Sequence, residues 1–148
     1  LMGSFRGGDF THTSDVPGVG LFRSTDGGDS WTRVGPDVGD VPVITECEGV
    51  LFAASDGGLL RSEDKGATWD NVHAGDFLGV ACYQDQVLTV GYDDLFRSQD
   101  GGDTWSEWFT GLESVQGHTR QMPQVAISAD GQVAYVALPT GGLFRRPL

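Results

Sequence analysis

Short apolar runs, bounded by Gly, Asp, Glu or Gln, recur along most of the chain. Examples are Val50–Ala54, Val87–Val90 and Val133–Ala137. Each is four or five residues long. None belongs to the 3.6-residue apolar stripe of an amphipathic helix. The pattern therefore predicts a chain made of short strands with tight turns between them.

A second pattern spaces these runs regularly. The segment GLFRSTDGGDSW at Gly20–Trp31 returns twice, as Gly58–Trp69 and Asp94–Trp105, and a truncated copy stands at Gly142–Arg146. The copies are 38 and then 36 residues apart, counted between their serines. Such a period is typical of helical solenoids or of β-propeller blades. Because the intervening segments are strand-like, we predict blades of four strands each.

The predicted fold class is therefore all-β, a β-propeller of four-stranded antiparallel blades. The chain holds about four blades as a single domain or half-propeller, over residues 1–35, 41–73, 78–108 and 123–148. The second blade is the clearest, and its predicted strands are Val43–Glu46, Val50–Ala54, Leu59–Ser62 and Thr68–Val72. The first strand of the first blade matches the pattern least well. The last blade has strands near Gln124–Ser128, Val133–Ala137 and Leu143–Arg146 and lacks a fourth.

With just under four blades, the sequence does not determine how the ring of blades is completed. Propellers have four to eight blades, so the chain forms a small ring, assembles with a second copy, or is half of a longer propeller. An incomplete last blade is typical of rings closed by a strand from the other chain end. Here the start of the chain supplies a first strand instead. This favours a missing half or a homodimer.

The charge of the chain is strongly negative. Its 148 residues include 21 Asp and Glu against nine Lys and Arg, a net charge of −12, and Lys65 is the only lysine. Such a field repels phosphate backbones, so no nucleic-acid partner is expected. The scarcity of lysine and the excess of Asp over Glu resemble proteins of extreme halophiles, whose surface charges are screened within roughly 3 Å in concentrated salt.

Targeting and redox signals are few. No apolar run approaches the ~20 residues of a membrane span, so no membrane insertion is expected, and no signal segment opens the chain. The compartment stays unknown.

Cys47 and Cys82 occupy near-equivalent places in successive repeats. A disulfide would need their Cα atoms within about 7 Å. The expectation is two free, buried thiols.

The repeated motif reads Ser-x-Asp-x-Gly-x-Ser/Thr-Trp. Its key residues are Ser24, Asp26, Gly28, Trp31; Ser62, Asp64, Gly66, Trp69; and Ser98, Asp100, Gly102, Trp105. It resembles the Asp-box, or bacterial neuraminidase repeat, and the resemblance covers essentially the whole chain. Proteins that carry this repeat include sialidases, xyloglucanases, sortilin-type receptors and photosystem II assembly factors, and all are β-propellers.

Folding explains every residue of the motif. The Asp accepts hydrogen bonds from turn amides, and the Gly supplies the positive φ that a tight hairpin needs. The Trp buries apolar surface beneath the hairpin. We therefore expect these aspartates to be structural, and expect no metal or cofactor. The arginines that precede each motif, Arg23, Arg61, Arg97 and Arg145, are also expected to be scaffold, bridging blades, because a ring spreads equivalent positions apart.

The segments that do not repeat are better candidates for a site. In Asp-box propellers, ligands usually meet the face opposite the motif hairpins. The one long crossover, Glu107–Met122, carries the candidates Trp108, Phe109, His118 and Arg120. Acidic candidates on the same face are Asp56, Asp76 and Asp93, and Asp37, Asp40 and Asp94 gather on it as well. They would hold a basic partner or a cation, although the spaced oxygen ligands of a calcium loop are absent.

Two functions follow from these observations. The first is a non-catalytic scaffold that presents loops to a protein partner or a small polar, carbohydrate-like ligand. The alternative is a glycoside hydrolase, sialidase-like or xyloglucanase-like, or an inactive relative of one. Glycosidases use two carboxylates, and sialidases a tyrosine nucleophile. The candidate catalytic residues are Tyr92, Asp93 and Glu113. No arginine motif of the sialidase type precedes the first repeat, which argues against the enzyme.

Overall fold

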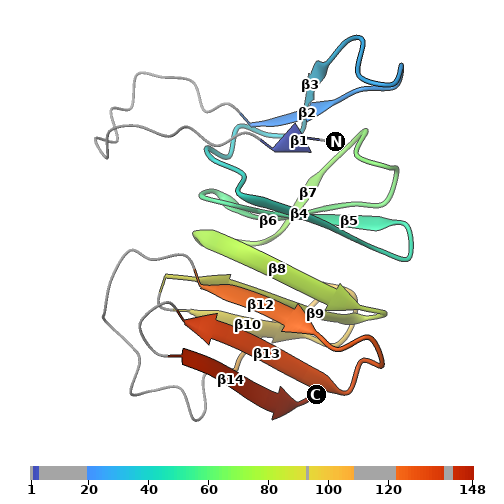
Figure 1. The fold of residues 1–148 in the computed structure, drawn as a ribbon. Helices are drawn as coiled ribbons and strands as arrows, with labels where there is room; N and C mark the ends of the chain where they lie inside the picture. Colours follow the sequence, from blue (N-terminus) through green and yellow to red (C-terminus); the bar gives the residue numbers. More distant parts are fainter. Residues whose placement is uncertain (1, 4–19, 93, 109–122, 139–141) are drawn as a thin grey trace.

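The protein is built from four antiparallel sheets that follow one another along the chain (Figure 1). The computed structural model describes residues 2–3, 20–92, 94–108, 123–138 and 142–148, which form fourteen strands and contain no helix. Blade 1 contains β1 (Met2–Gly3), β2 (Leu21–Arg23) and β3 (Thr32–Val34). Blade 2 contains β4 (Val43–Cys47), β5 (Val50–Ser55), β6 (Gly58–Ser62) and β7 (Asp70–His73). Blade 3 contains β8 (Phe77–Tyr83), β9 (Gln86–Gly91), β10 (Leu95–Ser98) and β11 (Ser106–Glu107). Blade 4 contains β12 (Gln124–Ile127), β13 (Val133–Leu138) and β14 (Gly142–Pro147).

The predicted all-β class and the four-stranded antiparallel sheets are confirmed. In blades 2 and 3 each strand pairs with its sequence neighbours. The last strand of blade 2 was predicted from Thr68, but β7 begins at Asp70. Thr68 belongs to the preceding hairpin, because its backbone N–H donates to the Asp64 carboxylate at 2.8 Å.

The start of the chain occupies a different place from the one expected. The prediction assigned the chain start to a first strand, but Met2–Gly3 pairs directly with β2, opposite Phe22 and Leu21. In blades 2 and 3 the strand with that neighbour is the second strand. Blade 1 therefore shows the second to fourth strands of a blade over its described residues, whereas blade 4 shows the first to third.

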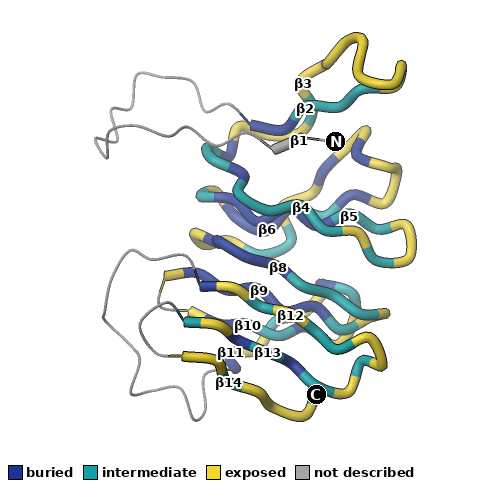
Figure 2. The backbone as a smooth tube through the Cα atoms, viewed as in Figure 1, coloured by how far each residue is buried: buried dark blue, intermediate teal, exposed yellow. Residues whose placement is uncertain are grey.

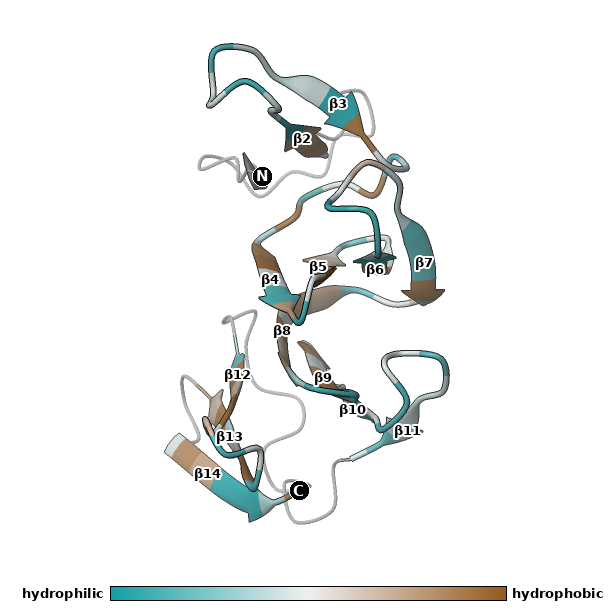
Figure 3. Cartoon of the chain, turned by 90° about the vertical axis from the view of Figure 1, so that its right-hand side faces the viewer, coloured by the Kyte–Doolittle hydropathy of each residue, from teal (hydrophilic) through white to brown (hydrophobic). Residues whose placement is uncertain are grey.

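The core lies between the sheets, because the central strands are apolar on both faces. Along β5, Leu51 and Ala53 pack toward blade 1, and Phe52 and Ala54 pack toward blade 3. This is the two-residue alternation of a strand with a neighbour on each side. A third cluster joins blades 3 and 4 through Leu88, among others. The apolar residues gather in the strands and the polar ones in the connecting hairpins (Figure 3). Each pair of consecutive blades thus shares one core.

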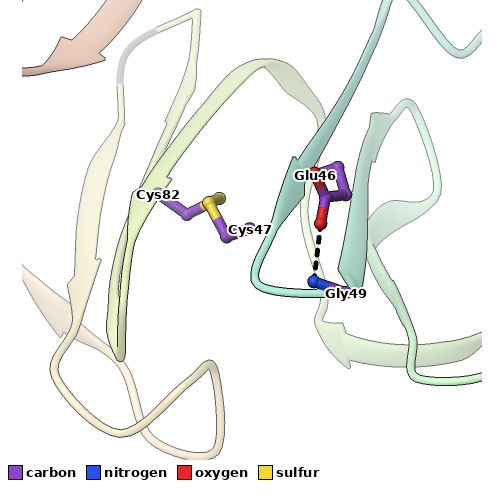
Figure 4. The surroundings of a disulfide bond; sticks show 4 residues. All are labelled: Glu46, Cys47, Gly49 and Cys82. Atoms are coloured by element: carbon purple, nitrogen blue, oxygen red, sulfur yellow. Dashed lines mark hydrogen bonds between the residues drawn. A yellow bond between two sulfur atoms is a disulfide. The ribbon is translucent and has the colours of Figure 1, made fainter. Parts of the chain in front are cut away.

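A disulfide joins blades 2 and 3, so the expectation of free thiols is wrong. Cys47 ends β4 and Cys82 lies in β8, and their Cα atoms are 6.1 Å apart (Figure 4). The two strands pack against each other, which brings the equivalent positions of successive repeats within bonding range. At the turn after Cys47, the Gly49 backbone N–H donates to the Glu46 carboxylate at 2.6 Å.

The stack of sheets is open. The first strand β4 packs on β8, and β8 packs on β12. Blades 1 and 4 lie at opposite ends of the stack (Figure 1), and the side view shows no return of the last sheet to the first (Figure 3). The described part of the chain is therefore an incomplete circle of blades.

Candidate functional site

The loops fall on two opposite edges of the stack. Because neighbouring strands are antiparallel, the turns after the first and third strands of every blade lie at one edge. The turns after the second strand and the crossovers between blades lie at the other edge, which we call the loop face. The described parts of the loop face are residues 20, 35–42, 56–57, 74–76, 92, 94, 108 and 123. The three motif hairpins, Ser24–Trp31, Ser62–Trp69 and Ser98–Trp105, lie at the opposite edge, and we call them the box hairpins.

Two of the acidic candidates meet at blade 2. The Asp56 backbone N–H donates to the Asp40 carbonyl at 3.2 Å, so the crossover into blade 2 lies against the turn of that blade. Gly39 packs on the Asp56 side chain. Asp37, from the same crossover, forms an ion pair with Arg33 at 2.9 Å, and both side chains are exposed. An exposed pair of this kind contributes little stability.

A second acidic group forms at blade 3. The Gly91 backbone N–H donates to the Asp94 carbonyl at 2.8 Å. A Cβ on Gly91 would lie only 2.5 Å from the Asp76 carbonyl oxygen, so the crossover presses directly on this turn. Asp76 and Asp94 are exposed, and Tyr92, two residues before Asp94, is 49% exposed. These adjoining turns therefore carry an exposed phenol and two exposed carboxylates.

The long crossover yields one described candidate. Trp108 is buried in the core between blades 3 and 4, and its backbone N–H donates to the Leu95 carbonyl at 2.8 Å. The guanidinium carbons of Arg97 and Arg146 lie 5.6 and 4.7 Å from the centroid of its ring. This burial gives the indole a packing role between blades. The candidates Asp93, Phe109, Glu113, His118 and Arg120 lie outside the described residues.

The box hairpins share one hydrogen-bond network. In the second hairpin the Gly66 backbone N–H donates to Ser62 Oγ at 2.8 Å, the Thr68 backbone N–H to Asp64 Oδ1 at 2.8 Å, and the Trp69 indole to the Gly66 carbonyl at 3.2 Å. The first and third hairpins repeat these bonds at Asp26 and Asp100. The glycines Gly28, Gly66 and Gly102 have φ of 103°, 80° and 95°, where a side chain would be strained.

These bonds also explain the acidity of the motif carboxylates. Hydrogen bonds from Thr68 hold the pKa of Asp64 at about 2, and those from Thr104 and Ser98 hold that of Asp100 at about 2. The pKa of Asp26 is lowered in the same way, chiefly by Ser30 and Ser24. Donors to a carboxylate favour its charged form. The described carboxylates whose pKa is lowered therefore lie in hairpins at the edge opposite the loop face.

The repeated arginines do not converge. Arg61 of blade 2 reaches the third box hairpin, where it donates to the Gly101 carbonyl at 3.0 Å and to Asp103 at 2.7 Å. Arg97 stays within blade 3 and donates to Gln86 Oε1 at 2.7 Å. The bridge between blades that the sequence suggested is thus made by Arg61, and Arg97 uses an amide that the motif does not predict.

The buried ring nitrogen of His73 was not predicted from the sequence. The His73 ring stacks on Trp105 and Phe77, with centroids 5.0 and 5.3 Å away, and meets the edge of Phe96 at 4.4 Å. Its Nε2 is buried without a hydrogen-bond partner among the described residues. Burial lowers its pKa, and Asp94 opposes that shift. The aromatic partners come from three other strands or hairpins, so no local sequence signal marks this position.

The described residues contain no cluster of three or more His, Cys, Asp or Glu side chains placed to bind a metal ion. Within those same ranges, no helix is long and apolar enough to cross a membrane.

Comparison with known proteins identifies the architecture. No protein-family model and no curated protein matches the sequence. Among solved structures, an ancestral GH74 enzyme superposes with a TM-score of 0.63 at 14% identity over 88% of this chain and 20% of its own. The extracellular domain of a protein described as a hybrid two-component system from B. thetaiotaomicron gives 0.57 at 16% identity over 87% of this chain and 19% of its own. YCF48 bound to a D1 peptide gives 0.50 at 16% identity over 72% of this chain and 38% of its own.

These likenesses, with the four stacked antiparallel sheets, define an all-β repeat protein of the β-propeller class. At sequence identities below 25%, a structural likeness supports a shared fold alone. The chain spans between about a fifth and two fifths of the length of these neighbours. Together with the open stack, this makes the structure a partial propeller.

Proposed function

We propose that the chain is a non-catalytic propeller scaffold whose loop face binds a basic segment of a protein partner. The observation that carries the proposal is the grouping of Asp76, Tyr92 and Asp94 on adjoining turns of blade 3, all exposed to solvent. Tyrosine beside carboxylates suits a lysine or arginine side chain, because the ring faces the cation and the carboxylates neutralise it.

Three further features support this function. The net charge of −12 attracts a basic partner over long range. The shared core and the disulfide, which lies at the edge opposite the loop face, fix blades 2 and 3 relative to each other, which lowers the entropy cost of binding. A protein of similar fold, YCF48, has been solved with a peptide bound.

The test is the binding of a fluorescein-labelled oligolysine peptide, followed by anisotropy at low salt. The double variant Asp76→Asn, Asp94→Asn should weaken binding by about tenfold, since each lost surface charge contributes up to about 1 kcal/mol. The matched control is Glu48→Gln, Asp85→Asn, which removes the same charge from turns at the opposite edge. An equal loss in both double variants would show that only net charge acts and that the loop face is not the site.

The glycoside hydrolase stays the second candidate, on the exposed phenol of Tyr92. Its other two residues, Asp93 and Glu113, lie outside the described part of the chain. Turnover of aryl glycosides discriminates the two functions. An enzyme would release the aryl group and lose that activity in Tyr92→Phe, whereas the scaffold would bind the peptide and release nothing.

A further inference from the structure

The junction between consecutive blades has a repeated design. The box hairpins of blades 2 and 3 each pack onto the blade before them. The Trp105 indole donates to the Val72 carbonyl of blade 2 at 3.1 Å and stacks on His73 at 5.0 Å. Trp69 likewise packs in the core shared with blade 1, beside Gly35, and is 8% exposed.

The opposite side of each junction is also repeated. A leucine at the start of the third strand of each of blades 1 to 3 packs in the core shared with the following blade. Leu21 lies between blades 1 and 2, Leu59 between blades 2 and 3, and Leu95 between blades 3 and 4, and all three are fully buried. Two residues after Leu59, Arg61 crosses the same junction to Asp103. The junction between blades 2 and 3 therefore joins a leucine and an arginine to a box-hairpin tryptophan and aspartate, and the junction between blades 1 and 2 repeats the leucine and the tryptophan.

Blade 1 presents the second half of this junction to solvent. Trp31 is the equivalent of Trp69 and Trp105 and is 41% exposed. Its hairpin is otherwise formed normally, with the indole donating to the Gly28 carbonyl at 3.1 Å. Asp29 stands at the position of Asp103, is exposed, and has no hydrogen bond or ion pair with another described residue.

Blade 4 presents the first half. Leu143 is the equivalent of the three buried leucines and is 71% exposed. Arg145 stands at the position of Arg61, is exposed, and lacks a partner among the residues that the structure describes. Among the described strands β14 is the edge of its sheet, so one row of its backbone groups has no partner strand there. Figure 2 shows β14 and the hairpin between β2 and β3 as exposed segments at opposite ends of the stack.

We infer that these two ends bind each other between two copies of the chain. Arg145 of one copy pairs with Asp29 of the other, as Arg61 pairs with Asp103, and Leu143 meets Trp31. Of the three large apolar side chains exposed among the described residues, two are Trp31 and Leu143, one at each end. Head-to-tail contacts of this kind form a ring when the rotation closes. Two copies supply eight sheets, which lies within the range of known propellers.

The experiment is sedimentation equilibrium of the full chain in about 0.15 M and about 3 M KCl, which brackets strong and weak charge screening. The wild-type chain should sediment at twice its mass of 15.8 kDa. Asp29→Arg and Arg145→Asp should each raise the dissociation constant at least about tenfold in dilute salt, since like charges then meet at both junctions. The double variant Asp29→Arg, Arg145→Asp should restore the dimer, because the pair is exchanged rather than lost.

Asp85→Arg is the matched control, because it reverses one charge on a turn of blade 3, away from both ends. Circular dichroism confirms that each variant is folded. A wild-type chain that stays monomeric would overturn the inference, and so would a dimer that neither single variant weakens. A ladder of larger species would refute the closed ring of two copies. Peptide binding to the loop face is measured separately, so the two proposals fail independently.

Discussion

The disulfide between Cys47 and Cys82 offers the most direct test of how the blades are held together. The bond joins residues 35 apart in the sequence, and it ties the first strand of blade 2 to that of blade 3. Removing it leaves most of the core between these blades, since Phe52, Phe77 and Val80 are buried there and Cys82 packs only at its margin as a partly buried residue. The main effect therefore acts on the unfolded chain, which gains the freedom to open this loop.

The size of the effect follows from the length of the loop. In the chain-entropy model, a link across 35 residues stabilises the folded state by about 4 kcal/mol at 25 °C. Domains are stable by about 5–15 kcal/mol in total, so the bond supplies a large fraction. With a urea m-value of about 2 kcal/mol/M, the double variant Cys47→Ser, Cys82→Ser should unfold at a urea concentration about 2 M lower.

The assay is urea unfolding followed by tryptophan fluorescence, for oxidised protein, reduced protein and the double variant. The reduced protein and the variant should unfold together, and reductant should leave the variant unchanged. The reasoning would be refuted by a midpoint shift of less than about 0.5 M. Titration of two free thiols in the folded, unreduced protein would refute the bond itself.

Four further predictions concern stability. Lys65 has φ of 60°, where the other box hairpins carry glycine, so Lys65→Gly should raise stability by up to about 1 kcal/mol, and a lower melting temperature would contradict this. The pKa of Asp64 is about 2 in the folded chain and 3.8 when free, so the stability that its carboxylate contributes is complete above pH 3.8 and is lost as the pH falls toward 2. The melting temperature should therefore depend less on pH over that range in Asp64→Asn than in the wild-type chain. Burial lowers the pKa of His73 below 6.5, so the melting temperature should decline as the pH falls below 6.5, and His73→Phe should abolish that decline. The net charge of −12 predicts a higher melting temperature in concentrated KCl, and a lower one would contradict the salt-adapted interpretation.

The blades could be predicted well from the sequence because the residues that determine each strand and hairpin lie close together in the sequence. An apolar strand, a hairpin with Gly at positive φ and an Asp that accepts its amides are all determined within about a dozen residues, as Ser62–Trp69 shows. The strand bounds of blade 2 follow from this pattern to within one residue, apart from the start of the last strand, where the bond from Thr68 to Asp64 keeps Thr68 in the hairpin.

Features that depend on the angle between sheets were not predictable in the same way. Whether Cys47 reaches Cys82 depends on how closely β4 and β8 pack, which no residue within either repeat determines. The surroundings of His73 depend on Phe96 and Trp105 from the next blade. The face opposite the box hairpins was predicted as the site from the family resemblance. The structure adds the contact that brings Asp76 beside Gly91.

The repeated arginine shows why repetition alone does not determine what a blade contacts. Arg61 bridges two blades because the next box hairpin carries Asp103 in the matching position. At that position the second hairpin has Ala67, so Arg23 meets no carboxylate there, and blade 4 carries no box hairpin to receive Arg97. One repeated side chain therefore has different partners according to the residue that the following blade offers. By the same reasoning Arg145 needs a blade with an aspartate at this position, and Asp29 is the aspartate that stands there with no ion pair to another described residue.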